Sequence, residues 1–270
     1  MIGGLSGGGP KTFIFDLDGV VYVDHAGVPG ANEALAALER AGHQILFATN
    51  NSSRAVGTVI ENIQERTGYR AESDAIITSG LAAANFLSDG AERCFVFGSE
   101  ELEQTLVAEG IEVTRDHALA TAVVVGLDRN LTYERLTSAV LAVRRGARLV
   151  ATNDDATYPA EEGQYPGCGA IVAAIERASN ATAVVCGKPH PPMQRLIESK
   201  VEHSEVWMVG DRAETDLALA ERAGWGKILV LSGVTGPDVA SASVAPPHHT
   251  LGSIADLASL MSAETHNIGG

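Results

Sequence analysis

The sequence is poor in lysine, cysteine and aromatic residues, and it has no long hydrophobic segment. No apolar run approaches the length of about 18 residues that a membrane-spanning helix needs, so we expect no membrane partner. The cysteines are Cys94, Cys168 and Cys186, which are widely spaced and form no CxxC pair. This spacing indicates neither a disulfide framework nor a zinc site. It favours a reducing compartment, and we expect a cytoplasmic protein.

Positive charge is also scarce. The formal net charge is −15 at pH 7, and lysine occurs only at positions 11, 188, 200 and 227. Because such a chain repels polyanions on average, this charge argues against DNA or RNA as the main partner. An acidic protein that handles small anions needs a local source of positive charge.

Length and composition suit a globular protein of one large domain, or of a core domain with a second one inserted. The chain has 270 residues, of which 45% are hydrophobic and 20% charged. The first ten residues, MIGGLSGGGP, contain no Lys or Arg and no apolar h-region. They are therefore not typical of a secretory signal, and we predict a flexible leader over residues 1–10.

Short apolar runs rich in β-branched residues alternate with helical patterns along the whole chain. This alternation predicts an α/β fold with a Rossmann-like parallel sheet, because parallel strands need crossover helices. We predict strands at residues 12–16, 44–49, 93–98, 121–126, 148–152, 182–186, 205–210 and 227–231. We predict helices near residues 31–41, 53–67, 79–89, 100–109, 132–145, 169–179, 191–201, 214–223 and 253–261.

Unusual polar residues crowd the ends of predicted strands before residue 55 and after residue 186, whereas the middle of the chain has few. The middle nevertheless has its own alternation of strands and helices. This distribution indicates an insertion: a catalytic core formed by residues 11–80 and 186–270, and an α/β cap domain formed by residues 81–185.

Two carboxylates, Asp16 and Asp18, follow the apolar run Phe13–Phe15. In an extended strand, residues i and i+2 point to the same side, so we expect both side chains to face one point. Polar residues also follow three other predicted strands. Since ligands bind outside the carboxyl ends of parallel strands, these four ends are candidates for one shared crevice. The polar segments that follow the other three strands are Thr49–Ser52, Gly187–Pro189, and Gly210–Arg212 with Asp216.

The acids among these residues predict a metal site. Asp16, Asp18 and Asp211, with Asp216 behind them, offer too few oxygen ligands to dehydrate an ion fully. Such a set suits Mg²⁺ better than an all-protein calcium cage. With a metal bound, Asp16 could attack phosphorus as a nucleophile and form an aspartyl-phosphate. Asp18 could then serve as the general acid and base.

The remaining strand ends predict an anion site. Thr49, Asn50 and the backbone N–H groups that follow them would form an oxyanion nest at a helix N-terminus. Lys188 would neutralise a phosphate or keep a neighbouring carboxylate ionised.

Each pattern alone has a simpler interpretation. An isolated DxD pair often binds solvent or caps a helix, and TNN is common turn chemistry. The acids at 211 and 216 would complement a helix dipole, and Lys188 would be a surface lysine. Because all four patterns occur at the ends of predicted strands, together they favour the functional interpretation.

Taken together, the segments "DLDGVVY", "TNNSSR", "GKPHP" and "GDRAETD" resemble, in order, the four motifs of the haloacid dehalogenase (HAD) superfamily. The resemblance is closest to the NagD-like, 4-nitrophenylphosphatase branch with a class IIA cap, and it covers about residues 11–261. It implies Asp16 as nucleophile, Asp18 as acid and base, and Mg²⁺ held by Asp16, the Asp18 carbonyl and Asp211.

The resemblance also assigns supporting roles. It implies phosphate binding by Thr49, Asn50, Lys188 and Gly19, and it places Asp216, Asn51 and Arg212 behind the metal and phosphate ligands. Asn153 and Asp155 lie where the cap would contact substrate. One departure from the family's pattern is Glu214, where relatives often carry a smaller acid or amide, and the sequence does not assign its role.

The predicted function is hydrolysis of small phosphorylated metabolites, with a possible homodimer formed through the cap. The alternative is a non-catalytic, phosphate-binding regulatory module on the same scaffold. The sequence does not rank the candidate metabolites.

Overall fold

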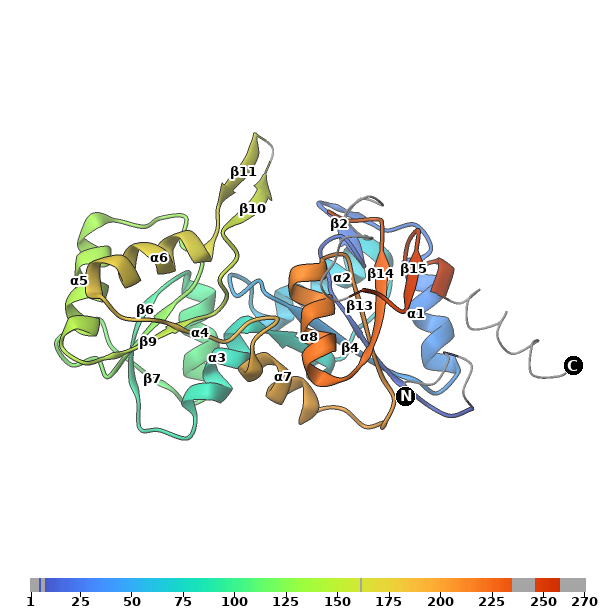
Figure 1. Cartoon of the computed structure of the whole chain (residues 1–270), viewed down its shortest axis with the longest axis horizontal. Coiled ribbons are helices and arrows are strands. Elements are labelled where there is room, and N and C mark those ends of the chain that lie inside the picture. Colours follow the sequence, from blue (N-terminus) through green and yellow to red (C-terminus); the bar gives the residue numbers. More distant parts are fainter. Residues whose placement is uncertain (1–4, 6–7, 161, 235–245, 258–270) are drawn as a thin grey trace, which may run out of the picture. The chain divides into compact units, whose positions relative to one another are not determined.

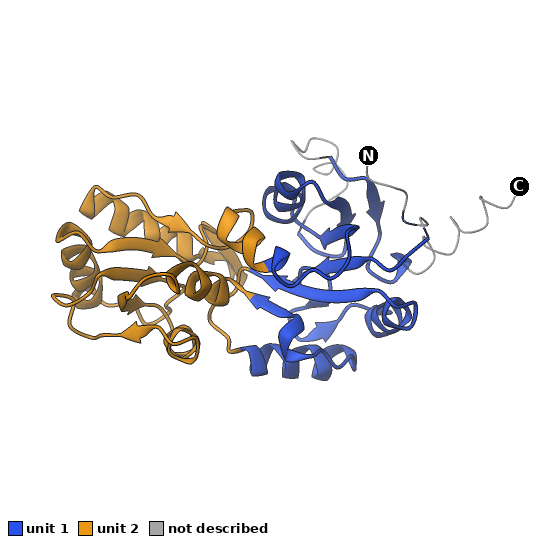
Figure 2. Ribbon diagram, turned by 90° about the horizontal axis from the view of Figure 1, so that it is seen from below, with its two compact units in different colours: residues 1–49, 56–77, 197–270 blue, residues 50–55, 78–196 orange. Residues whose placement is uncertain are grey.

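The computed structural model describes residues 5, 8–160, 162–234 and 246–257 (Figure 1). Tertiary contacts divide the chain into two compact units (Figure 2). The first comprises residues 1–49, 56–77 and 197–270, and the second comprises residues 50–55 and 78–196. Within the predicted leader, Leu5 is buried in the core of the first unit.

A six-stranded sheet, in the order β15-β14-β13-β1-β4-β5, forms the centre of the first unit. The central strand β1 pairs in parallel with β13 on one side and with β4 on the other. All four residues of β1 are buried, as expected for a parallel strand covered on both faces. The strands are β1 (Thr12–Phe15), β4 (Gln44–Thr49), β5 (Ile76–Thr78), β13 (Val206–Gly210), β14 (Gly226–Val230) and β15 (His249–Leu251).

Helices and a small hairpin complete the first unit. Phe13 and Phe15, two residues apart on β1, share a core cluster with Leu35 and Leu38 of α1 and Ile63 of α2. The helical segments are α1 (Ala31–Arg40), α2 (Val56–Thr67), η1 (Ser73–Ala75), η2 (Ala213–Leu217) and α8 (Ala218–Ala223), and the hairpin strands are β2 (Tyr22–Val23) and β3 (Ala26–Gly27).

The second unit contains a five-stranded sheet, in the order β12-β9-β8-β6-β7, and all of its pairings are parallel. Its strands are β6 (Arg93–Phe97), β7 (Glu112–Val113), β8 (Ala122–Val125), β9 (Arg148–Ala151) and β12 (Val184–Val185). An antiparallel hairpin of β10 (Thr157–Ala160) and β11 (Gly163–Pro166) follows β9.

The helices of the second unit are α3 (Ser79–Leu87), α4 (Glu100–Ala108), α5 (Tyr133–Arg144) and α6 (Cys168–Ser179), and α7 (Pro191–Glu198) crosses the division between the units. Thr132 caps α5 by accepting a hydrogen bond from Arg135 N at 3.2 Å, as its sequence pattern predicts. Gly146, with φ of 107°, follows the helix as a stop.

The structure confirms the α/β class with parallel sheets, and each predicted strand corresponds to an observed one. Within the described residues, the prediction missed seven short strands, which are β2, β3, β5, β7, β10, β11 and β15. It missed β15 because Pro246-Pro247 and two histidines indicate a surface approach rather than a strand. His249 instead pairs with Ile228 of β14, and its ring lies 5.6 Å from that of Trp207. The end of the helix predicted at 253–261 lies outside the described residues.

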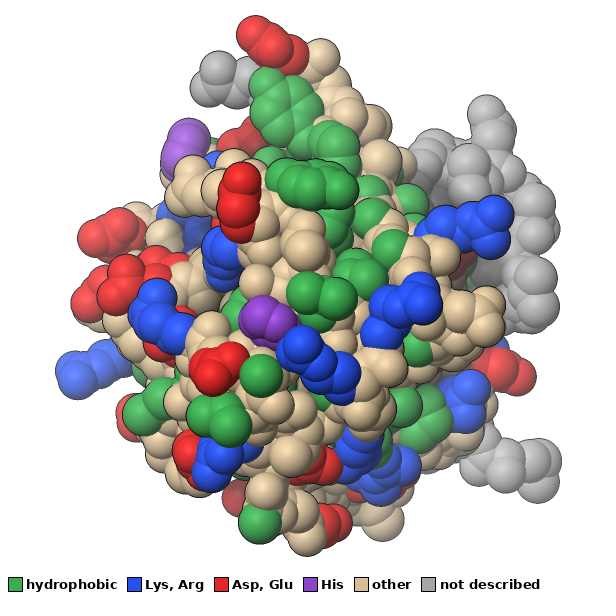
Figure 3. Space-filling model, turned by 90° about the vertical axis from the view of Figure 1, so that its left-hand side faces the viewer, with side chains coloured by type: hydrophobic (Ala, Val, Ile, Leu, Met, Phe, Trp, Pro, Cys, Tyr) green, Lys and Arg blue, Asp and Glu red, His purple; other side chains and the backbone are tan. Residues whose placement is uncertain are grey.

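Charged side chains of both signs lie on the surface. In the face shown in Figure 3, basic and acidic side chains are interspersed, and no extended field of one sign covers it. Among the residues that the structure describes, none of the helices is both long and apolar enough to cross a membrane.

Replacement of Gly226 by alanine should lower the free energy of unfolding by about 1–3 kcal/mol, because a Cβ there would lie 2.2 Å from Cε3 of the buried Trp207. Gly57 on α2 is the matched control, because a Cβ at this position would meet nothing within 4 Å. Gly57→Ala should raise the free energy of unfolding by up to about 1 kcal/mol. Urea denaturation checks both, and equal effects would contradict the packing at Trp207.

The three cysteines should be inert in the native protein. All are free and buried, and burial raises the pKa of Cys94 and Cys186 to about 12 and that of Cys168 to about 11. Because the thiolate is the reactive form, a disulfide reagent at pH 8 should react with three thiols only after denaturation. A rapid native reaction would contradict the described burial.

Candidate active site

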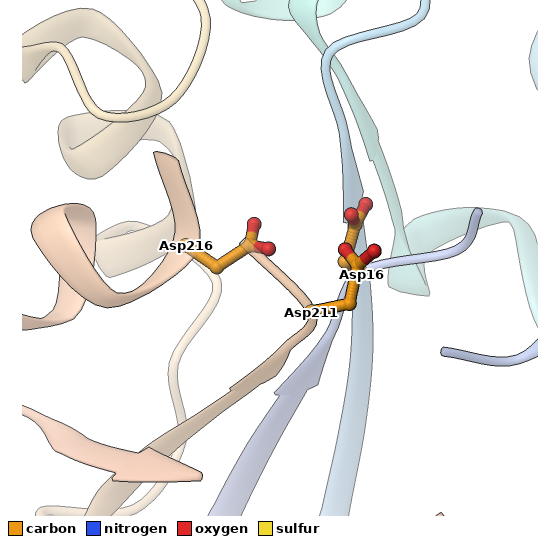
Figure 4. A group of neighbouring side chains, drawn as sticks. All are labelled: Asp16, Asp211 and Asp216. Atoms are coloured by element: carbon orange, nitrogen blue, oxygen red, sulfur yellow. The ribbon is translucent and has the colours of Figure 1, made fainter. Parts of the chain in front are cut away.

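Three aspartates meet at the carboxyl ends of two adjacent strands in the first unit. Asp16 follows β1 and Asp211 follows β13, and the register Phe15↔Val209 places these two strand ends side by side. Asp216 lies on the π-helical turn η2, from which it points toward the other two (Figure 4). One carboxylate oxygen from each aspartate lies within 4.8 Å of the others. Asp211 and Asp216 are 0% exposed and Asp16 is 8% exposed.

Backbone N–H groups orient all three carboxylates. Leu17 N donates to Asp16 Oδ1 at 2.8 Å, and Val234 N donates to Asp211 Oδ2 at 2.7 Å. Arg212 N donates to Asp216 Oδ2 at 3.1 Å. Each acid therefore has at least one of its oxygens held by the main chain around it.

Glycines make the space around two of these acids. A Cβ on Gly19 would lie 2.5 Å from Asp211 Oδ2, and a Cβ on Gly233 would lie 2.0 Å from the same atom. A Cβ on Gly210 would lie 2.3 Å from Asp216 Cβ. Gly233 was not predicted, because the segment "SGVTG" has no pattern that indicates contact with a distant acid.

The donor set fits a small divalent cation. Hard carboxylate oxygens are the ligands that Mg²⁺ and Ca²⁺ prefer, and oxygens on opposite sides of a Mg²⁺ ion lie about 4 Å apart. A separation within 4.8 Å is compatible with that geometry. Without a cation, three acids at this spacing repel one another in surroundings that screen charge poorly.

The prediction that Asp18 faces the same point as Asp16 assumed that strand geometry continues to residue 18. The predicted strand 12–16 ends at Phe15, and the chain bends at Leu17 before the turn at Gly19, whose φ is 87°. Alternation of side chains along a strand therefore does not extend to residue 18. Asp18 is exposed, and its side chain is not among the three grouped acids.

The predicted phosphate residues are distributed over both units. Thr49 ends β4 and is buried in the first unit, whereas Asn50 and Lys188 belong to the second. Gly19 N donates to Tyr22 O at 2.8 Å, so its backbone N–H serves the turn. The structure gives Gly19 a different role, which is its close approach to Asp211.

In the second unit, Asn50 contacts the turn formed by residues 187–190, which we call the GKPH turn. Its carboxamide Oδ1 accepts a hydrogen bond from Lys188 N at 2.7 Å, and its Nδ2 donates to Lys188 O at 3.1 Å. The predicted cap residues lie beside it. Asn153 Nδ2 donates to Asn50 O at 2.7 Å, and the Asp155 carboxylate lies 3.4 Å from Asn50 Nδ2.

The sequence analysis did not predict one polar pair near this cluster. His190 Nε2 lies 3.0 Å from Asp154 Oδ2, and this hydrogen bond lowers the pKa of Asp154. The sequence analysis assigned a role to Lys188 of this turn and none to His190. Only the folding of residues 152–155 next to this turn brings the pair together.

The other predicted supporting residues contact nearby backbone. Asn51 Oδ1 accepts hydrogen bonds from Ser53 N and Ser53 Oγ. Arg212 presents its N–H to Asp216, and Glu214 is exposed on η2.

Comparison with known proteins agrees with this arrangement. A family model described as haloacid dehalogenase-like hydrolase matches residues 13–112, and a HAD-hydrolase-like model matches residues 185–257. The acid sugar phosphatase of Staphylococcus saprophyticus is 34% identical over 89% of this chain and 93% of its own length. Mouse (Mus musculus) chronophin is 36% identical over 93% of this chain and 92% of its own length.

Solved structures are similar over nearly the whole chain. The 4-nitrophenylphosphatase from Thermotoga maritima matches with a TM-score of 0.87 and 33% identity, covering 93% of this chain and 97% of its own. NagD from E. coli K-12 matches with a TM-score of 0.84 and 32% identity, covering 92% and 98%. The chain thus belongs to the haloacid dehalogenase superfamily and, within it, to the NagD-like branch of phosphatases.

Proposed function

We propose that the protein is a Mg²⁺-dependent phosphomonoesterase that hydrolyses small soluble phosphate esters through an aspartyl-phosphate on Asp16. The observation that carries this proposal is the grouping of three buried acids at adjacent strand ends. Asp16 is the most exposed of the three, at 8% against 0% for Asp211 and Asp216. This difference favours Asp16 as the group that a substrate reaches, and the other two as groups that hold the cation.

The proposed reaction has two displacements at phosphorus. An oxygen of Asp16 forms a bond to phosphorus while the bond to the alcohol oxygen breaks, and Asp18 gives its proton to the departing oxygen. Water then attacks the same phosphorus, Asp18 accepts a proton from it, and the Asp16 carboxylate leaves as inorganic phosphate forms. The exposure of Asp18 supports this role, because the leaving alcohol and the attacking water must both reach its carboxyl group.

Asp16, Asp211 and Asp216, with the carbonyl of Asp18, would hold the Mg²⁺ ion. When bound, the ion supplies positive charge that offsets the repulsion between the anionic nucleophile and the anionic ester. Thr49 and Lys188 would bind the phosphoryl oxygens. Lys188 is 2% exposed, and the electrostatic attraction of a buried ammonium for phosphate is screened little by water.

We further propose that the substrate is a small phosphorylated metabolite selected by the second unit, for which Asn153 and Asp155 are the predicted contacts. A cytoplasmic location agrees with three free, buried cysteines. Assignment of residues 81–185 as the cap, and of a homodimer formed through it, stays a prediction.

The first test is phosphate release from 4-nitrophenyl phosphate. The intact protein should release phosphate with Mg²⁺ and lose that activity in EDTA. Asp16→Asn should lower kcat by at least about a thousandfold, because an amide is a poor nucleophile for phosphorus.

Asp24→Asn is the matched control, since Asp24 is an exposed acid of the same unit. It should keep the activity of the intact protein. Unchanged release by Asp16→Asn would reject the covalent mechanism. No release by the intact protein from a panel of phosphorylated metabolites would favour the phosphate-binding module instead.

The second test separates the acids' repulsion from cation binding. In EDTA, Asp211→Asn should melt at a higher temperature than the wild type, because it removes one of three neighbouring buried charges. Mg²⁺ at about 100 times its Kd should raise the melting temperature of the wild type by about 5 °C and that of Asp211→Asn by much less. Scanning calorimetry measures both shifts.

Asp89→Asn makes the same chemical change at an exposed position in the second unit. Its Mg²⁺-induced shift should equal that of the wild type. An equal shift in Asp211→Asn would instead place the cation elsewhere.

A further inference from the structure

The side chain of Asn50 forms two hydrogen bonds with one peptide segment. Oδ1 accepts from Lys188 N at 2.7 Å and Nδ2 donates to Lys188 O at 3.1 Å. These are the donor and acceptor that a neighbouring strand would offer to an extended residue. The carboxamide thus holds the backbone from which the Lys188 side chain extends.

The backbone of Asn50 is itself fixed from two directions. Its carbonyl accepts hydrogen bonds from Ser79 Oγ at 2.6 Å and from Asn153 Nδ2 at 2.7 Å. Ser79 is 0% exposed and Asn153 is 5% exposed. Because both donors come from buried groups, the position of the Asn50 carboxamide depends on the fold of the second unit.

The contact between Asn50 and the GKPH turn leaves no room for a side chain at residue 187. A Cβ on Gly187 would lie 2.6 Å from Asn50 Oδ1 and 2.6 Å from Thr152 O. The glycine of the GKPH turn therefore permits the close approach that the two hydrogen bonds need. Its φ is not positive, so close packing, and not backbone conformation, explains the glycine here.

The carboxamide of Asn50 matches this pair of contacts, whereas an acid or an aliphatic side chain would not. A carboxamide places one acceptor and one donor side by side, whereas aspartate offers two acceptors and leucine offers neither. The neighbouring Asp155 carboxylate, 3.4 Å from Nδ2, favours the orientation in which the amide nitrogen faces it. An aspartate at residue 50 would face both this carboxylate and the Lys188 carbonyl.

From this geometry we propose that Asn50 is a positioning residue that acts on the bound phosphoryl group through Lys188, and not by touching the phosphate. The proposal rests on the phosphate-binding role of Lys188 in the proposed function. It replaces the sequence-based expectation that the Asn50 side chain itself binds phosphate. Displacement of a phosphate-binding group by about 1 Å can cost a large factor in rate, so a residue that fixes the lysine backbone matters for function.

A double-mutant cycle tests the proposal, with binding of inorganic phosphate in the presence of Mg²⁺ measured by titration calorimetry. Lys188→Met keeps the backbone that Asn50 contacts and removes the ammonium. Asn50→Leu, which removes both hydrogen bonds without adding charge, and Lys188→Met should each weaken phosphate binding about tenfold or more. The double variant should bind within about twofold of Lys188→Met, because the two residues act in series.

Independent effects that multiply in the double variant would overturn the proposal and support direct contact between Asn50 and phosphate. A general loss of structure would also lower binding in both backgrounds, so it would not reproduce the expected cycle. Asn50→Ser, whose hydroxyl ends one bond short of the Asn50 Oδ1 and Nδ2 positions, should weaken phosphate binding as Asn50→Leu does. It replaces Asn50→Leu in the cycle if that variant does not fold.

Asn85→Leu is the matched control, because it makes the same chemical change at an exposed position of α3 in the same unit. It should bind phosphate as the wild type does. Phosphate binding that depends on Lys188 without any ester hydrolysis would overturn the proposed activity alone. Absence of phosphate binding by the wild type would overturn the inference about Asn50 as well.

Discussion

Repulsion among Asp16, Asp211 and Asp216 is the constraint on which the first unit depends. The fold places them within 4.8 Å of one another, with at most 8% of any one exposed, where water relieves little of the repulsion. The parallel register of β1 and β13 imposes this proximity, because it ends both strands at the same level. Backbone N–H groups donate to each of the three acids, and closely packed glycines leave room for Asp211 and Asp216.

The parts of this site that could be predicted are those that local sequence controls. Phe13–Phe15 and Val206–Val209 are continuous apolar runs, which is how strands buried on both faces appear in a sequence. An acid directly after such a run must lie at a strand end. Asp16 and Asp211 follow from that pattern alone, and the closeness of the two strand ends follows from the parallel topology that alternating helices require.

The parts that could not be predicted depend on where the chain turns after a strand and on what packs against it. The strand before Asp18 stops one residue earlier than predicted, and Asp18, before the turn at Gly19, is exposed. Asn50 was expected to present its amide to a ligand, but folding places residue 188, distant in sequence, against it. The two-residue periodicity of a strand and the turn preference of Asn carry no information about such contacts.

A difference in the chemistry of the two units follows from these observations. In the first unit, the functional side chains are acids, and their charges favour a bound cation. In the second, the cationic Lys188 is buried at 2% exposure, and an uncharged amide orients its backbone. An aspartate at residue 50 would add negative charge beside Asp155 and would not donate to the Lys188 carbonyl. The neutral amide fixes geometry without altering local charge, which suits the attraction that we propose between the Lys188 ammonium and a phosphoryl group.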